Sequence, residues 1–132
     1  MKSHNPQSVW TVPEQFRTIY THAAEVPAGT RHLYVSGQFG VAPDGHMQAD
    51  FASQLDQALN NVEALLASAG MGKEDMVKTT FFLTRAADLA ALGEARRRRW
   101  ASDTPAAVTV IVVAALARPD ALVEVEVTGA RQ

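Results

Sequence analysis

The most regular hydrophobic pattern in the chain runs from Asp50 to Gly70. Its apolar residues recur at spacings of three and four, which gathers them on one stripe of an α-helix: Phe51, Leu55, Ala58, Leu59, Val62, Leu65 and Leu66. Asp50 precedes the first of them, where an aspartate can cap the helix, and Gly70 follows the last, where glycine commonly ends one. The pattern predicts an amphipathic helix between these two residues.

Five further segments are rich in β-branched and other apolar residues over lengths typical of strands: 18–24, 31–36, 76–83, 108–114 and 121–129. A second, shorter helix is predicted from Asp88 to about Trp100. Residues 27–30 have the composition of a hairpin turn between the first two strands, and residues 37–45 indicate a loop that closes on a tight turn at 43–45. Residues 1–15 show no clear period and are expected to form an N-terminal arm.

This order of elements predicts a single α+β domain over residues 1–132, with one sheet and two helices on one of its faces. Each helix has one apolar stripe and can cover only that face. The segment from Val108 to Val113 nevertheless offers apolar residues to both sides, as a doubly buried strand does. We therefore expect another copy of the chain to cover the second face.

Composition and charge narrow the functional classes. The chain has 132 residues, 47% of them hydrophobic and 20% charged, which is typical of a globular protein. A net charge of −2 argues against nucleic-acid binding, which depends on clustered Lys and Arg. The longest apolar run is far shorter than the roughly 20 residues that cross a bilayer, so no membrane partner is expected. The absence of cysteine fits a cytoplasmic protein, which is the location we expect.

The candidate site residues are polar groups next to strands. Glu124 and Glu126 share one face of a strand, where they are either surface carboxylates or, beside a cleft, a general base for water. Ser36 and Gly37 follow a strand and form either a plain turn or backbone donors for a ligand. Tyr20 is either a core aromatic or a hydrogen-bond donor in a cleft.

Arg96–Arg99 form the densest charge run, but four consecutive helical residues point in different directions and cannot make one patch. A solvated helix surface is the main interpretation, with an intersubunit ion pair or an anion site as the alternatives. The four histidines lack metal-ligand spacing, so no metal is expected, and no nucleotide fingerprint indicates a cofactor.

Several blocks resemble the RidA/YjgF family of small trimeric proteins, in order and spacing over roughly residues 18–130. They are Ile19–Ala23, Leu33–Gln38, Leu65–Gly70, Glu74–Thr84, Pro105 and Ala121–Glu126. The resemblance implies a chorismate-mutase-like fold of the YjgF type, assembled as a homotrimer with small-molecule clefts between subunits. It also places Tyr20, Ser36, Gly37, Ala107, Val108 and Glu124 at the cleft, with Glu124 as the candidate catalytic residue.

The deaminase branch of that family has Pro-Ala-Arg where this chain has Pro105, Ala106 and Ala107. In that branch the arginine pairs with the carboxylate of an imine or enamine substrate. Gly93 stands where asparagine is common in that branch, and the hairpin after the first C-terminal strand is about two residues longer than in a typical member. The resemblance therefore implies a divergent member that is not a 2-iminobutanoate deaminase of the usual kind. Arg118 or an arginine of 96–99 is a candidate replacement for the missing charge.

Two functions stay open from the sequence. One is hydrolysis or deamination of a small imine, enamine or related carbonyl compound, in a pocket that Val108 and Ile111 make more apolar. The other is a trimer that binds a small molecule or a partner without chemistry. A ribonuclease or translation inhibitor, a description that this family often carries, is disfavoured by the acidic charge balance.

Overall fold

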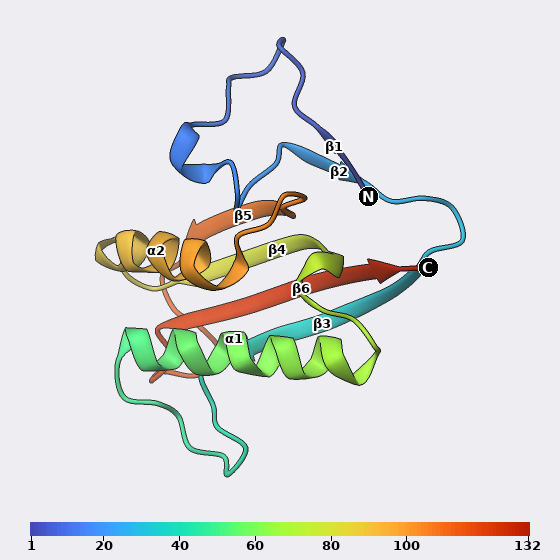
Figure 1. Ribbon diagram of the computed structural model, residues 1–132. Helices are drawn as coiled ribbons and strands as arrows, with labels where there is room; N and C mark the ends of the chain where they lie inside the picture. The colour runs from blue at the N-terminus through green and yellow to red at the C-terminus, as the bar shows by residue number, and fades with distance from the viewer.

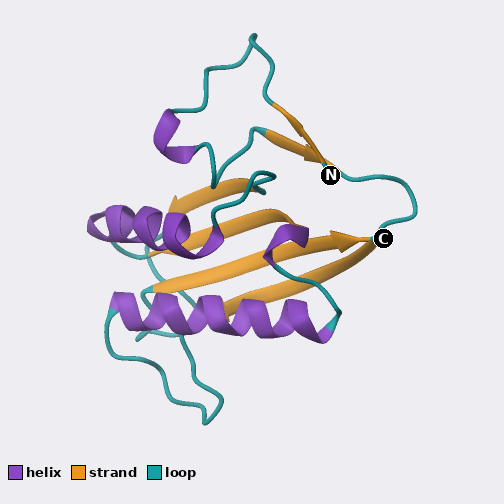
Figure 2. Cartoon of the chain, viewed as in Figure 1, coloured by secondary structure: helices purple, strands orange, loops and turns teal.

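A four-stranded mixed sheet carries two helices on one face (Figures 1 and 2). The computed structural model describes residues 1–132. The strand order is β3-β6-β4-β5, with β3 at Arg31–Phe39, β6 at Val123–Arg131, β4 at Met76–Leu83 and β5 at Ala107–Val112. Helix α1 spans Phe51–Ser68 and packs over β3 and β6, and α2 spans Leu89–Trp100. This is the predicted arrangement of one mixed sheet with both helices on the same side.

Strand register decides which side chains the helices cover. Strand β6 runs antiparallel to β3 and β4, whereas β4 and β5 are parallel and are joined through α2. Thr79, Phe81 and Leu83 of β4 are buried in the core beneath the helices, as are Val123, Val125 and Val127 of β6. Their neighbours therefore point to the opposite side, which we call the open face: Lys78, Thr80, Phe82, Glu124, Glu126, Thr128, Ala107, Thr109 and Ile111.

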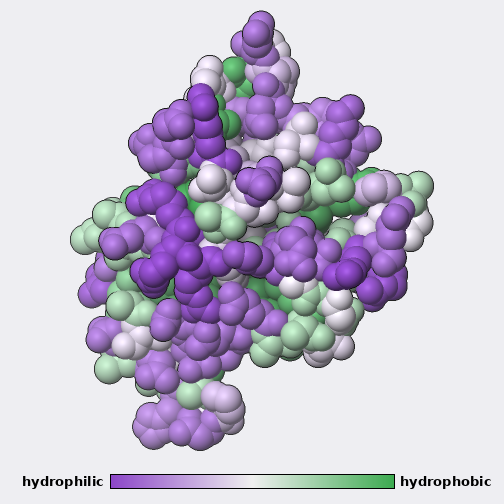
Figure 3. Space-filling view, viewed as in Figure 1, coloured by the Kyte–Doolittle hydropathy of each residue, from purple (hydrophilic) through white to green (hydrophobic).

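The core lies between the helices and the covered side of the sheet. Phe81, Leu59, Leu66 and Leu83 are among its fully buried side chains. Gln54, at 1% exposure, is the largest polar side chain that is fully buried, and all of its side-chain bonds go to the backbone of loops. Its amide donates to the carbonyls of Gln48 and Asp120, and its oxygen accepts from the N–H of Leu122. In the view of Figure 1 the outer surface is mainly hydrophilic, with smaller hydrophobic patches (Figure 3).

The central predictions are confirmed. Helix α1 begins after Asp50, whose carboxylate accepts the N–H of Ser53, and Gly70 follows it with a φ of 69°, a left-handed conformation that favours glycine. Strand β4 has the predicted bounds, and α2 ends at Trp100 as expected. The tight turn at residues 43–45 also forms, with Gly45 at a φ of 90°.

The predictions for the first 40 residues are partly wrong. Residues 18–24 do not form a strand: Thr21 makes a single bridge to Ala107, and only Ala23–Glu25 form the short strand β2. Strand β2 pairs with β1, Lys2–His4, in the segment expected to be an irregular arm, and a 3-10 turn follows at Glu14–Phe16. No hairpin joins β2 to β3, because β3 takes β6 as its partner.

The bounds of three strands also differ from the predictions. Strand β3 continues to Phe39 through a bulge between Val35 and Gln38, so Gly37 lies within it rather than in a loop. Strand β5 ends at Val112 and β6 runs on to Arg131, because pairing with neighbours, not composition, sets strand ends. Strand β5 is an edge strand, and Val110, Ile111 and Val112 are 36%, 40% and 44% exposed.

Candidate functional site

Glu124 lies on the open face directly above the β3 bulge. A Cβ atom added to Gly37 would come within 2.1 Å of the Oε2 atom of Glu124, so a side chain at position 37 would displace this carboxylate from its present place. Ser36, on the other side of the bulge, is exposed, and its carbonyl accepts a bond from Gln38. The structure thus brings Gly37 and Glu124 into contact and leaves Ser36 at the surface beside them.

Partial burial raises the pKa of Glu124 above its ordinary value of 4.5, and the negative charge of Glu126 raises it further. A carboxylate with a raised pKa holds its proton more firmly and is a stronger base once ionised. Both properties suit general acid–base work on water or on a ligand.

The raised pKa of Glu124 predicts a pH-dependent stability. The folded protein binds this proton more tightly than the unfolded chain does, so the associated stability is present below pH 4.5 and is lost as pH rises through the folded-state pKa. Glu124→Gln removes the titration, so its free energy of unfolding should exceed that of the wild type increasingly over this range. Urea unfolding between about pH 4 and 7 measures the difference. Glu94→Gln, at an exposed carboxylate of α2, is the control, and parallel profiles for wild type and Glu124→Gln would contradict the prediction.

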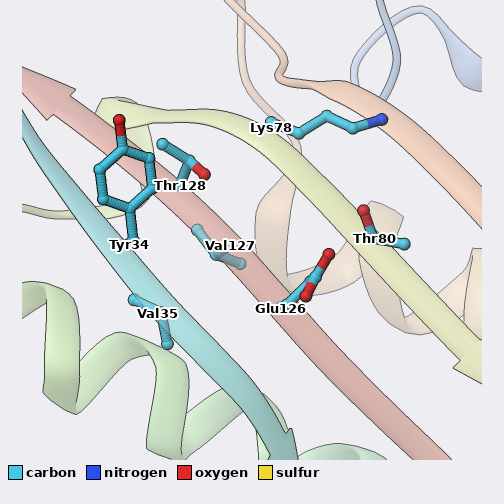
Figure 4. A pocket seen from close by; sticks show the side chains of 7 residues that line it. All are labelled: Tyr34, Val35, Lys78, Thr80, Glu126, Val127 and Thr128. Atoms are coloured by element: carbon cyan, nitrogen blue, oxygen red, sulfur yellow. The ribbon is translucent and has the colours of Figure 1, made fainter.

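A polar hollow of about 210 Å³ lies further along the open face (Figure 4). Tyr34 of β3, Lys78 and Thr80 of β4, and Glu126 and Thr128 of β6 line it, while Val35 points toward α1. The ammonium group of Lys78 donates to the Thr109 hydroxyl at 2.7 Å. Of this group, only Glu126 was singled out in the sequence. The alternation of Lys78 and Thr80 with Thr79 and Phe81 in the sequence could have placed these two polar side chains on one face of a strand. It could not show that three paired strands bring them together with Tyr34, Glu126 and Thr128.

Ala107 also lies on the open face, but far from Glu124 of the same chain. In the register, Ala107 is level with Lys78 and Thr128, whereas Glu124 is level with Phe82. That is four residues along the sheet and two strands across, or about 13 Å by about 10 Å from standard strand spacings. One copy of the chain therefore does not bring these two positions into a single small-molecule site.

Tyr20 and Val108 are placed apart from the open face. Both line a second hollow together with Arg96 of α2, and Val108 alternates with Ala107 so that it points toward the helix-covered side. The Tyr20 hydroxyl lies 3.1 Å from Nδ1 of His22, and Trp10 stacks against the Tyr20 ring at 5.9 Å between centroids. The six candidate residues are thus divided between two sides of the sheet within one chain.

The arginines do not replace the missing charge at Ala107 in this chain. Arg118 pairs with its neighbour Asp120 at 3.3 Å. Arg99 bonds to Asp56, Asn60 and Glu63 and so joins α2 to α1, whereas Arg97 and Arg98 are exposed. Arg96 is buried on the helix-covered side. The prediction that the four side chains point in different directions is confirmed. The prediction of a mainly solvated run is wrong for Arg96 and Arg99, because their guanidinium groups donate hydrogen bonds to other parts of the protein.

No three His, Asp or Glu side chains gather where they could hold a metal ion. No helix of the protein has the length and hydrophobicity needed to cross a bilayer.

Comparison with known proteins places this geometry in a family. A family model described as Endoribonuclease L-PSP matches residues 15–131. The structure of the Rid-family protein YyfB from Yersinia pestis superposes with a TM-score of 0.82 at 29% identity, covering 97% of this chain and 96% of that one. The structure of the YjgF gene product from Escherichia coli gives a TM-score of 0.69 at 32% identity, covering 86% and 88%.

Sequence relatives include the 2-iminobutanoate/2-iminopropanoate deaminase of E. coli, which is 42% identical over 59 residues, or 44% of this chain and 46% of that protein. A RutC family protein of Aquifex aeolicus is 36% identical over 77 residues, and the match spans 62% of its length. The mixed sheet and paired helices are the chorismate-mutase-like fold of these structures. The chain belongs to the RidA/YjgF family, some of whose members are named reactive-intermediate deaminases.

Proposed function

We propose that this protein binds a small metabolite in clefts formed where the open faces of neighbouring copies meet, in a homotrimer. The separation between Ala107 and Glu124 carries this proposal. They are about 16 Å apart by strand spacing within one chain, so a cleft that contains both positions has to take Glu124 from one copy and Ala107 from the next.

Exposed apolar side chains support the assembly. Ile111 on the open face of β5 is 40% exposed, Tyr34 of β3 is 77% exposed, and Val110 and Val112 leave further apolar area at the sheet edge. Exposed apolar side chains are the kind of surface that a second copy of the chain can bury. Three copies is the number that the family resemblance implies. A stable monomer of 14.2 kDa in light scattering would contradict the assembly and the shared cleft with it.

The chemistry that such a cleft supports is hydrolysis of a small imine, enamine or related carbonyl compound. Glu124 is the group that can take a proton from water, and Gly37 leaves the space that its carboxylate occupies. Ala107 supplies no charge and no donor for a substrate carboxylate, so the deamination of simple α-imino acids is not the proposed reaction. The second candidate function is a trimer that binds a small molecule or a partner without catalysing a reaction. The absence of a side-chain donor at Ala107 favours this function as well.

An imine-hydrolysis assay tests this proposal. Imines generated from serine or threonine by a dehydratase should hydrolyse at their spontaneous rate in the presence of the wild-type protein, with keto-acid release as the readout. Ala107→Arg should accelerate the reaction measurably, because it restores a guanidinium that can pair with the substrate carboxylate in two hydrogen bonds. The E. coli deaminase is the positive reference.

Ala107→Gln is the matched control, since it adds a long polar side chain without the charge, and it should give no acceleration. Wild-type activity equal to that of the reference would show that Ala107 does not prevent the reaction. An Ala107→Arg variant that stays folded and trimeric without any acceleration would show that Gly37 and Glu124 no longer form a competent deaminase cleft.

A further inference from the structure

Arg96 is a buried cation without an anionic partner. Its residue is 6% exposed, and no carboxylate lies within 4.0 Å of its guanidinium. One of its five N–H donors has a protein acceptor, the carbonyl of Ile19 at 2.6 Å, and its Cζ lies 5.1 Å from the centre of the Phe81 ring. Burying an unpaired charge costs free energy, so such a group normally has a partner.

The unpaired nitrogens of Arg96 are not fully enclosed. No fully enclosed side-chain nitrogen or oxygen of this protein lacks a hydrogen bond, so the guanidinium nitrogens without protein partners must keep some accessible surface. Burial, with a smaller effect from the neighbouring Arg97, lowers the pKa of Arg96 to about 10, which still leaves it charged at neutral pH. The cation therefore persists at the edge of a mostly dry environment.

Arg96 also lines an apolar pocket of about 240 Å³. Its walls come from the N-terminal segment, β5 and α2: Trp10, Phe16, Tyr20, Val108, Val110 and Arg96. The pocket is smaller than the roughly 300–1,000 Å³ of drug-sized sites, so it fits a small molecule. Val108 points away from the open face, so this pocket lies on the other side of the sheet from Ala107 and Glu124.

We propose that this pocket is a second ligand site, which binds a small monocarboxylate with an aromatic or branched apolar body. The aromatic and valine side chains would enclose the body, and the guanidinium of Arg96 would pair with the carboxylate. One cation among apolar walls matches one negative charge, whereas a phosphate dianion would be left undercompensated. The site does not depend on the proposed cleft or its chemistry, because it uses different residues on the opposite face.

Calorimetric titration with phenylacetate, indole-3-acetate and isovalerate tests the proposal on the full chain. At least one should bind with a Kd below about 1 mM, and phenylacetamide, which has the same ring without the charge, should bind at least about tenfold more weakly than phenylacetate. Trp10 is 61% exposed and lines the pocket, whereas Trp100 is buried elsewhere, so binding should also change the fluorescence of Trp10.

Arg96→Met should weaken carboxylate binding by about 10- to 100-fold, since a charge-assisted hydrogen bond is lost. Arg97→Met, at the adjacent exposed arginine, is the matched control and should leave Kd unchanged. Trp10→Ala should weaken binding through the apolar wall without touching the charge. If Arg96→Met fails to fold, Arg96→Lys, which keeps the charge but loses the planar fork, replaces it and should still bind more weakly than the wild type.

Three results would overturn the proposal. One is the absence of binding by all three carboxylates up to about 1 mM. Another is equal affinity for phenylacetate and phenylacetamide. The third is an Arg96 variant that binds as tightly as the wild type, which would restrict Arg96 to holding Ile19 and Phe81 in place. None of these results bears on the imine assay, so failure here leaves the proposed function standing.

Discussion

Phe81→Ala should lower the free energy of unfolding by about 3–5 kcal/mol, the cost typical of a fully enclosed aromatic side chain. Phe81 is 0% exposed at the centre of the covered face, with its ring centre 6.0 Å from that of Trp100. Arg96 lies over the ring, so alanine would both open a cavity and remove a cation–π contact. Urea unfolding at a fixed protein concentration measures the loss.

Phe16→Ala is the control for this prediction. Phe16 is only partly buried and lies outside the core, so its loss should cost about 1 kcal/mol. Similar losses for the two variants would mean that the sheet and α2 do not share the tight core described above. Carboxylate affinity gives a further comparison. A larger loss of affinity in Phe81→Ala than in Trp10→Ala would indicate that Phe81 positions Arg96.

Gln54→Leu should lower the free energy of unfolding by about 3 kcal/mol, although leucine fits a buried helical position well. The substitution leaves the N–H of Leu122 and the carbonyls of Gln48 and Asp120 without their partner. Each buried, unsatisfied polar group costs about 1–3 kcal/mol, which outweighs the gain from a more apolar side chain. Urea unfolding measures the loss, and amide hydrogen exchange at Leu122 should rise more than at the strand residues of β4.

Gln57→Leu is the matched control, because it makes the same change on the same helix, about one turn further along, at a position that is only partly buried. The Gln57 amide bonds only to Asn61, four residues on, and a pair of that kind contributes less than about 0.5 kcal/mol. Equal effects for the two leucine variants would show that helix propensity, not the three loop contacts, determines the result.

The pattern of hydrophobic residues was enough to place the elements that carry their own periodicity. Helix α1, with its cap at Asp50, and strand β4 could be predicted because burial on one stripe or one face leaves a mark every three to four residues or every second residue. The resemblance to the RidA/YjgF family, which the comparisons confirm, also follows from linear order and spacing. The strand predicted at residues 18–24 is wrong, because Ile19 is apolar for another reason: it packs inward at a turn and does not pair in the sheet.

The sequence by itself thus determined the helices, the central strands, the family and the absence of an arginine at Ala107. Only the tertiary structure decided which of these residues meet, because strand pairing joins positions that are distant in the chain. It places Glu124 against Gly37, collects Lys78, Thr80 and Thr128 on the open face, and separates Ala107 from Glu124. It also turns Arg96 inward while Arg97 and Arg98 stay in solvent, since one helical step of about 100° changes which side chain faces the sheet.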